Sequence, residues 1–244
     1  MSSDVYFVLG SSGSGRREVV VDLIEGGFDA GDNITVAVAN SEKISPMDEQ
    51  LSARQHTEVV SYDYPADVQI ADDSTLFLIA RGDTEPGDEI ETFQSWLKQS
   101  GANLCRILMV TDCSLAEREP KLEPWFDCCI HFSDVVLLNR RETVSPKWMR
   151  AFEKRYTSMH LPCLFELVKK GRVANPAQVL DPLARRYSLL FDDIDAVDQM
   201  DFDPNNLPEE TIDLVAPADP WLERLPSGQR AKPVPDIREY LAKD

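Results

Sequence analysis

A run of glycine, serine and arginine follows the first apolar segment of the chain, and its spacing fits phosphate binding. The run consists of Gly10, Ser11, Ser12, Gly13, Ser14, Gly15, Arg16 and Arg17. Phosphate-binding loops have the pattern G-x-x-x-x-G-K-[ST] between a strand and a helix, because glycines let backbone N–H groups curl around a phosphate and the helix N-terminus adds partial positive charge. Gly10 and Gly15 have this spacing. The run therefore predicts a phosphate site.

The second half of the loop departs from that pattern. Arg16 stands where the lysine belongs, and Arg17 stands where a Ser or Thr would coordinate Mg²⁺. A guanidinium can pair with a phosphate oxygen, although its shape and reach differ from those of an ammonium, and it cannot ligate a cation. We therefore expect a loop that could bind phosphate but is poorly equipped for hydrolysis. The alternative is a Gly/Ser-rich turn that only joins a strand to a helix.

Five apolar runs position this loop and recur with helix-like sequence between them. They cover residues 5–9, 34–39, 76–80, 107–111 and 135–138. Continuous apolar runs are typical of parallel strands that helices cover on both faces. Apolar periodicity predicts helices at 16–25, 89–99 and 146–156, and a short helix with a basic end is expected at 163–172. The pattern predicts an α/β fold with a mainly parallel sheet.

Further motifs resemble the CobW-like family of P-loop GTPases, which is grouped with the UreG and HypB metal-insertion GTPases. Asn40, Glu42 and Asp48 partly match the family's Asn-Glu-x-Gly segment and its later Asp. Gly82 and Pro86 keep its Gly-x-x-x-Pro turn, whereas Ile79 stands where the family has an acidic residue. The resemblance implies a three-layer P-loop NTPase-type fold with helices on both faces of the sheet.

The same resemblance implies a switch or magnesium region and a base-binding segment. The first consists of Asn40, Asp48, Gly82, Asp83 and Asp112, of which Asp83 or Asp112 would have to rebuild a weakened Mg²⁺ site. The second consists of Asn139, Arg140 and Glu142, which resemble the family's Asn-Lys-x-Asp guanine box. The alternative for this second group is a strand-end cap and a solvated ion pair.

The family's metal motif, Gly-Cys-x-Cys-Cys, has no counterpart in this chain. Residues 59–65, where the family's crossover would carry it, read Val-Val-Ser-Tyr-Asp-Tyr-Pro. The five cysteines, at positions 105, 113, 128, 129 and 163, are scattered on apolar elements. Such placement predicts buried free thiols rather than disulfides or a metal site.

Charge and hydropathy exclude several partners. The net charge of −18 opposes attraction to a nucleic-acid backbone or to anionic lipid. The apolar runs are far shorter than the roughly 20 residues of a membrane span, and the N-terminus has no secretion signal, so a cytoplasmic protein is expected. Residues 191–244 hold 14 acidic and 5 basic residues. We expect a nucleotide-binding-type domain at 1–172 and an acidic, partly irregular extension at 173–244.

Three functions compete at this level. The first is a CobW-like GTP-binding-type protein, with GTP or GDP as the purine nucleotide, uncertain Mg²⁺ support and weak or absent hydrolysis. The second is a non-enzymatic scaffold that keeps the fold without nucleotide and holds an unidentified protein partner through switch-like loops or its acidic tail, in which Trp221, Leu222 and Leu225 stand among acids and prolines. Those residues could equally cover the protein's own core. The third and weakest is a kinase or ATPase in which Arg16 replaces the lysine.

Overall fold

The structure, a computed structural model, describes residues 3–192 and 218–241. Its centre is a sheet whose eight strands in this part of the chain have the order β3-β2-β4-β1-β5-β6-β7-β8. The pairings from β3 to β7 are parallel, and β7 pairs with β8 antiparallel. The predicted α/β fold with a mainly parallel sheet is confirmed.

The strands have the bounds β1 Asp4–Leu9, β2 Ile34–Ala39, β3 Thr57–Tyr62, β4 Thr75–Ile79, β5 Asn103–Asp112, β6 Val135–Asn139, β7 Leu164–Lys169 and β8 Arg172–Val173. The α-helices are α1 Arg16–Gly27, α2 Pro46–Ala53, α3 Pro86–Ser100, α4 Cys113–Arg118, α5 Glu123–Phe132, α6 Pro146–Ser158 and α7 Pro176–Leu180. Three short 3-10 helices are η1 Pro65–Asp67, η2 Pro120–Leu122 and η4 Ile237–Glu239. The three predicted helices correspond to α1, α3 and α6.

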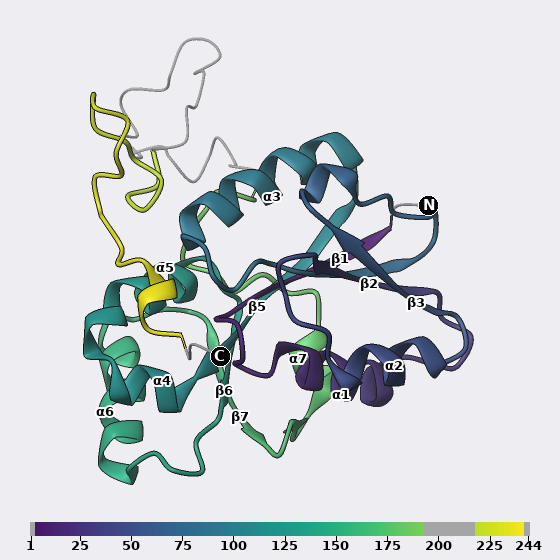
Figure 1. Cartoon of the computed structure of the whole chain (residues 1–244), viewed down its shortest axis with the longest axis horizontal. Coiled ribbons are helices and arrows are strands. Elements are labelled where there is room, and N and C mark those ends of the chain that lie inside the picture. Colours follow the sequence, from purple (N-terminus) through teal and green to yellow (C-terminus); the bar gives the residue numbers. More distant parts are fainter. Residues whose placement is uncertain (1–2, 193–217, 242–244) are drawn as a thin grey trace, which may run out of the picture.

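Helices cover both faces of the sheet (Figure 1). On one face, α1 packs against α2 and α7 over a core of strand residues such as Val8, Val36 and Leu108. On the other, α3 and α5 pack over Phe7, Leu78 and Met109. Burial on both faces explains why the central strands read as continuous apolar runs. Among the described residues, no helix is long and apolar enough to cross a membrane.

Two sequence expectations about local structure are wrong. Residues 57–62, taken as crossover, form the edge strand β3, so the apolar run at 76–80 is the fourth strand and not the third. Residues 163–172 are not a helix: they form β7, a turn and β8. Lys170 and Gly171 both have positive φ, of 52° and 75°, which suits a two-residue hairpin turn. The parallel pairing of β7 with β6 overrides the helix-like composition of this segment.

The chain beyond β8 returns to the sheet. The Tyr6 hydroxyl donates to the Leu180 carbonyl at 2.7 Å, and the buried Arg106 donates to the carbonyls of Gln178 and Leu183. Asp134, fully buried, accepts from the backbone amides of Arg185 and Arg186 and forms an ion pair with the Arg186 guanidinium at 3.3 Å. Residues 176–188 are therefore held against the strands by buried polar contacts.

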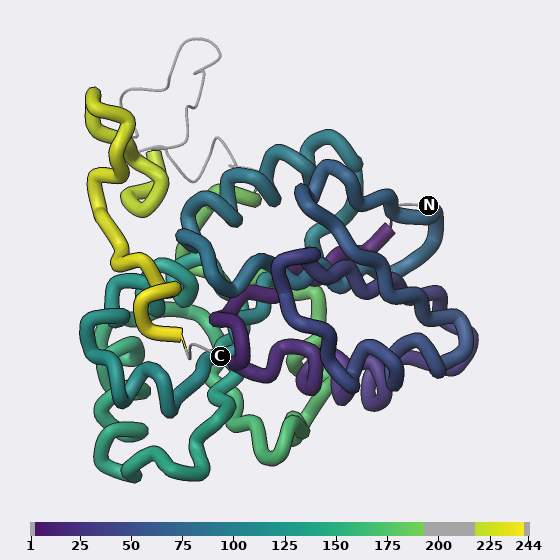
Figure 2. The backbone as a smooth tube through the Cα atoms, viewed as in Figure 1, coloured from purple at the N-terminus to yellow at the C-terminus, as the bar shows by residue number. Residues whose placement is uncertain are grey.

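Residues 218–241, hereafter the C-terminal strap, lie beside the N-terminal end of α3 and continue over α5 (yellow in Figures 1 and 2). Trp221 and Leu222 pack against the apolar core, whereas Leu225 is exposed. Trp221 and Leu222 thus cover the protein's own core, and Leu225 does not. The most acidic part of the predicted extension, around Asp203, lies outside the described residues.

Candidate phosphate site

The loop of residues 10–17, hereafter the phosphate loop, joins β1 to α1. A residue at the end of β6, which is separated from β1 by β5, holds it in place. The Asn139 side chain, at the end of β6, donates from Nδ2 to the Ser14 carbonyl at 2.8 Å. Gly15 has a φ of 91°, and a Cβ there would lie 2.4 Å from that same Nδ2. A glycine is required here both for its left-handed backbone and for the close approach of Asn139.

Arg16 points inward, beneath the loop, and not into solvent. Its side chain is 4% exposed, and its guanidinium donates to the Ala80 carbonyl and, at 2.5 Å, to Glu42 Oε1. Ala80 follows β4, and Glu42 lies in the segment after β2. The arginine therefore has two partners from two neighbouring strand ends.

Glu42 accepts hydrogen bonds from three groups beside the phosphate loop. Besides Arg16, its Oε1 accepts from the Ser12 hydroxyl at 2.8 Å and from the Gly82 amide at 3.0 Å. Burial raises the pKa of this carboxyl, but the Arg16 guanidinium and the hydrogen bonds from Ser12 and Gly82 outweigh burial, so its pKa is lowered from the usual value. Glu42 is therefore a carboxylate at neutral pH, and it neutralises the Arg16 guanidinium.

The turn at residues 81–85 is packed tightly on the phosphate loop. Ser12 donates its amide to the Gly82 carbonyl at 2.9 Å, while the Gly82 amide holds Glu42. A Cβ on Gly82 would lie 2.2 Å from the Ser12 nitrogen. The contact leaves no room for a side chain, so the turn and the loop hold Glu42 between them.

A cavity of about 490 Å³ opens beside this arrangement. Its lining includes Arg16, Arg17, Lys43, Arg140 and the acidic Glu18, Glu42 and Asp83. Its volume lies in the range of small-molecule sites. In the loop itself, the hydroxyls of Ser11 and Ser14 are buried and have no hydrogen-bond partner. Neither serine is among the residues that line the cavity.

The structure places several predicted residues away from the loop's interior. Arg17 lines the cavity but donates to the Lys43 carbonyl and lies 3.3 Å from Asp48, so it ties the loop to α2. Asp48 also accepts from the Ser45 amide as part of the α2 capping box. Asn40 is exposed and donates to Asp63 at 3.0 Å. Asn40 and Asp48 thus have structural partners and do not line the cavity.

The two aspartates considered for magnesium differ. Asp83 lines the cavity, and its Oδ1 is buried without a hydrogen-bond partner. Asp112 caps α4 by accepting from the Leu115 amide at 2.9 Å, and burial raises the pKa of its carboxyl. Asp112 is not among the cavity residues. The structure therefore brings one of the two into the candidate site.

The predicted base-binding residues also separate. Asn139 is buried and holds Ser14. Arg140 lines the cavity, where it donates to the Gly13 carbonyl and pairs with Glu18 at 2.8 Å. Glu142 is exposed and does not line it. Asn139 thus ties the end of β6 to the phosphate loop, and Arg140 pairs with Glu18 rather than with Glu142. Base binding by this segment stays a prediction.

The cysteines are buried free thiols, as predicted. Burial raises the pKa of Cys105, Cys113 and Cys163 to about 12. Thiols with such pKa values stay protonated and are poor metal ligands at neutral pH. Within residues 3–192 and 218–241, no group of three or more His, Cys, Asp or Glu side chains could hold a metal ion.

The sequence interpretation did not foresee two features of the site. Glu42 was noted as part of a displaced motif but not as the partner of Arg16, and Leu241 of the C-terminal strap lines the same cavity. The pairing of Arg16 with Glu42 could have been suspected, because an arginine stands in the lysine position and an acidic residue follows the second apolar run. Nothing near Leu241 in the sequence indicated the second.

Acid should weaken the fold partly through Glu42. Its folded pKa lies below the unfolded value of about 4.5, so the unfolded chain binds more protons in that window. The Glu42 contribution to stability is full above about pH 4.5 and is lost as pH falls through the folded pKa. We expect the unfolding free energies of wild type and Glu42→Gln to differ at pH 7 and to converge as pH falls through the folded pKa of Glu42, as measured by urea denaturation. Glu58→Gln, at an exposed position on β3, should follow wild type throughout; equal pH curves for Glu42→Gln and wild type would contradict this.

Comparisons with known proteins agree with the fold. No family model matches the sequence, and no curated protein matches it. FtsY from Mycoplasma mycoides has a TM-score of 0.50 at 12% identity, over 73% of this chain and 63% of that chain. Zn(II)-bound YjiA GTPase from E. coli and its Zn(II)-bound triple mutant have TM-scores of 0.46 and 0.48 at 14% identity, each over 76% of this chain and 67% of that chain. The chain thus spans about two thirds of their lengths. It has the α/β fold of P-loop NTPases.

Proposed function

We propose that this protein is a CobW-like GTP-binding-type protein in which Glu42 closes the phosphate loop, so that nucleotide binds weakly and is hydrolysed slowly or not at all. One observation carries the proposal: Glu42 is seated on Arg16, Ser12 and Gly82 as an internal anion. A nucleotide phosphate that displaces this carboxylate would find the same donors. Binding then has to compete with a partner that the chain supplies itself.

Three features support phosphate as the ligand. The loop lies between a strand and the N-terminus of α1, whose partial positive charge favours anions. The cavity beside it is lined by four cationic side chains, from Arg16, Arg17, Lys43 and Arg140. The Ser11 and Ser14 hydroxyls are buried and unpaired. Together these features suit a polyphosphate better than an apolar ligand.

The donor set around the loop does not fit a magnesium ion. Arg17 replaces the hydroxyl residue, and Ile79, which lines the cavity, is apolar. Among the described cavity residues, Asp83 Oδ1 is the single buried carboxylate oxygen without a hydrogen-bond partner. Phosphoryl transfer depends on Mg²⁺ and a loop lysine to neutralise developing charge, and this chain has neither of the usual supports. Slow or absent hydrolysis follows.

A scaffold without nucleotide is the second candidate, and the same closed loop favours it. The loop's main charge, Arg16, is already neutralised, so the fold does not need a ligand for electrostatic balance. In that case the nucleotide-binding-type domain at 1–172 and the acidic extension would serve a protein partner. The two candidates differ in whether GTP enters the loop.

Calorimetric titration of nucleotide-stripped protein with GTP, GDP and ATP, with and without Mg²⁺, tests the proposal. We expect weak, guanine-selective binding that depends little on Mg²⁺, and GTP turnover no faster than about 10⁻⁴ per second. Arg16→Ala should weaken binding about tenfold, because a charge-assisted hydrogen bond to phosphate is lost.

Arg150→Ala is the charge-matched control, since Arg150 is exposed on α6 and, among the described residues, donates to the Pro146 carbonyl of its own helix. It should bind GTP like wild type. No binding of any of the three nucleotides, by wild type or by a variant with Glu42 removed, would leave the scaffold as the surviving candidate. Fast, Mg²⁺-dependent turnover would overturn the proposed lack of catalysis.

A further inference from the structure

The C-terminal strap is attached at its start to α5. Asp219 accepts from the Ser188 hydroxyl at 2.6 Å and lies 2.8 Å from His131 Nε2. Trp221, two residues further on, packs against the core, and Lys232 lies over its ring at 5.0 Å. These contacts fix the direction in which the strap leaves the body of the protein.

The middle of the strap is attached to the first turn of α3 through Arg230. Its side chain is 4% exposed and contacts three carboxylates: Glu85 at 2.9 Å, Asp88 at 2.6 Å and Glu91 at 2.8 Å. Gly87 permits this approach, since a Cβ there would lie 3.1 Å from the Arg230 guanidinium carbon. A largely buried arginine with three acidic partners is the main electrostatic anchor of the strap.

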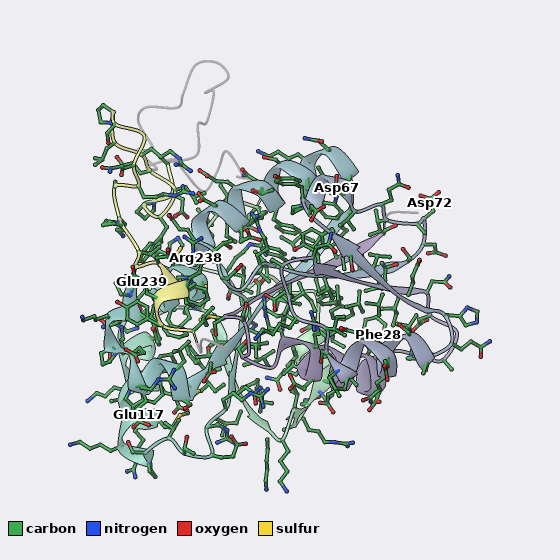
Figure 3. All side chains as sticks on the ribbon, in the orientation of Figure 1. Phe28, Asp67, Asp72, Glu117, Arg238 and Glu239 are labelled. Carbon is green, nitrogen blue, oxygen red and sulfur yellow. The ribbon has the colours of Figure 1, made fainter. Side chains whose placement is uncertain are left out.

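The end of the strap reaches the phosphate site. Ile237 is 1% exposed and belongs to the apolar core, and Leu241 lines the cavity beside the phosphate loop. Arg238 and Glu239 of η4, which Figure 3 labels, lie between Ile237 and Leu241 in the chain. The strap thus runs from α5 across α3 to the mouth of the candidate site.

The turn at residues 81–85 lies between the strap and the phosphate loop. On one side, Glu85 pairs with Arg230, and Asp83 and Thr84 line a second cavity of about 350 Å³ together with Pro235 and Ile237. On the other side, Gly82 is bonded to Ser12 and Glu42. The Gly82 amide is one of the donors to Glu42, and Gly82 belongs to a turn whose last residue, Glu85, is paired with the strap.

We propose that the C-terminal strap is autoinhibitory: docked through Arg230 and Ile237, it keeps the turn at residues 81–85 closed on the phosphate loop and so keeps Glu42 in place. This regulation rests on the proposed function of the site. Release of the strap frees the turn, lets Glu42 leave and admits a polyphosphate. By reciprocity, a bound polyphosphate favours the undocked strap.

Amide hydrogen exchange on the full chain without ligand tests the mechanical step. Arg230→Ala should speed exchange at Ala231 and Tyr240 of the strap and, by about tenfold or more, at Ser12 and Gly82 of the site, because local opening controls exchange. Arg224→Ala is the control: Arg224 pairs with the same Asp88 and Glu91 but is exposed, and exposed pairs contribute little. Its exchange pattern should match wild type.

GTP affinity in the same variants tests the functional step. Arg230→Ala should bind GTP several-fold more tightly than wild type, and Ile237→Ser, which removes the apolar anchor, should do the same. The proposal is overturned if the strap amides exchange faster in either variant while the amides of Ser12 and Gly82 exchange at the wild-type rate. It is equally overturned if neither variant loosens the strap, or if GTP binds both variants and wild type equally.

The two proposals fail in different ways. If GTP binds no form of the protein, including one without Glu42, the proposed function fails, and the exchange at Ser12 and Gly82 alone decides whether the strap controls the loop. If GTP binds with the same affinity to wild type and to Arg230→Ala, the proposed function stands and the proposed autoinhibition fails.

Discussion

Glu42→Ala should raise the affinity for GTP by about tenfold or more, equivalent to about 1.4 kcal/mol. The substitution removes a carboxylate that occupies the donors of Arg16, Ser12 and Gly82. It also leaves the buried guanidinium of Arg16 without its acidic partner, a state that an entering phosphate relieves. Both effects act in the same direction, and calorimetry with GTP measures them together.

Glu49→Ala provides the matched control for net charge. Glu49 is exposed on α2, close in sequence to Glu42 but outside the cavity lining. Its replacement should leave GTP affinity within about twofold of wild type, since exposed charges interact weakly across solvent. Unchanged or weaker GTP binding by a folded Glu42→Ala protein would contradict the idea that Glu42 closes the loop.

Asp134→Ala should destabilise the protein by about 3–5 kcal/mol, the cost of removing one partner of a buried ion pair. Asp134 is fully buried and accepts from the amides of Ile107, Arg185 and Arg186 as well as from the Arg186 guanidinium. Its loss removes one of the two acidic partners of the buried Arg186 guanidinium, which also contacts Asp192, and leaves the amides of Ile107, Arg185 and Arg186 without this acceptor. Urea or thermal denaturation measures the change.

Asp181→Ala is the comparison for that result. Asp181 is exposed and lies 3.8 Å from Arg106, so its removal should cost no more than about 1 kcal/mol. Similar stabilities for the two variants would mean that Asp134 does not hold residues 185–186 to the sheet. A large loss in Asp134→Ala would favour including these residues in the folded domain, beyond the predicted boundary at 172, which stays a prediction.

The central part of the fold was predictable because its strands are buried on both faces. β1, β2, β4, β5 and β6 are continuous apolar runs, and this pattern has few other interpretations. β3 and β7 lie toward the sheet's edges, where fewer side chains are buried and polar residues interrupt the run. Their strand conformation depends on pairing with β2 and β6, which local sequence does not show.

The phosphate loop was predictable because its glycines and its place between strand and helix are local features. The partner of Arg16 was not, since Glu42 lies 26 positions away in the sequence and could have pointed to solvent. The contact arises because β2 and β4 are neighbours in the sheet and their ends meet at the loop. The sequence likewise could not show that Arg230 pairs with Glu85 and Asp88 at the start of α3. This pairing brings the strap toward the site.

The position of Glu42 in the presence of nucleotide tests the central claim most directly. A crystal structure of the full chain with saturating GDP would show it. The account predicts diphosphate on the amides of the phosphate loop, the Arg16 guanidinium on a phosphate oxygen, and Glu42 displaced from Ser12 and Gly82. A loop without nucleotide, or GDP bound while Glu42 keeps its contacts with Arg16, Ser12 and Gly82, would contradict it.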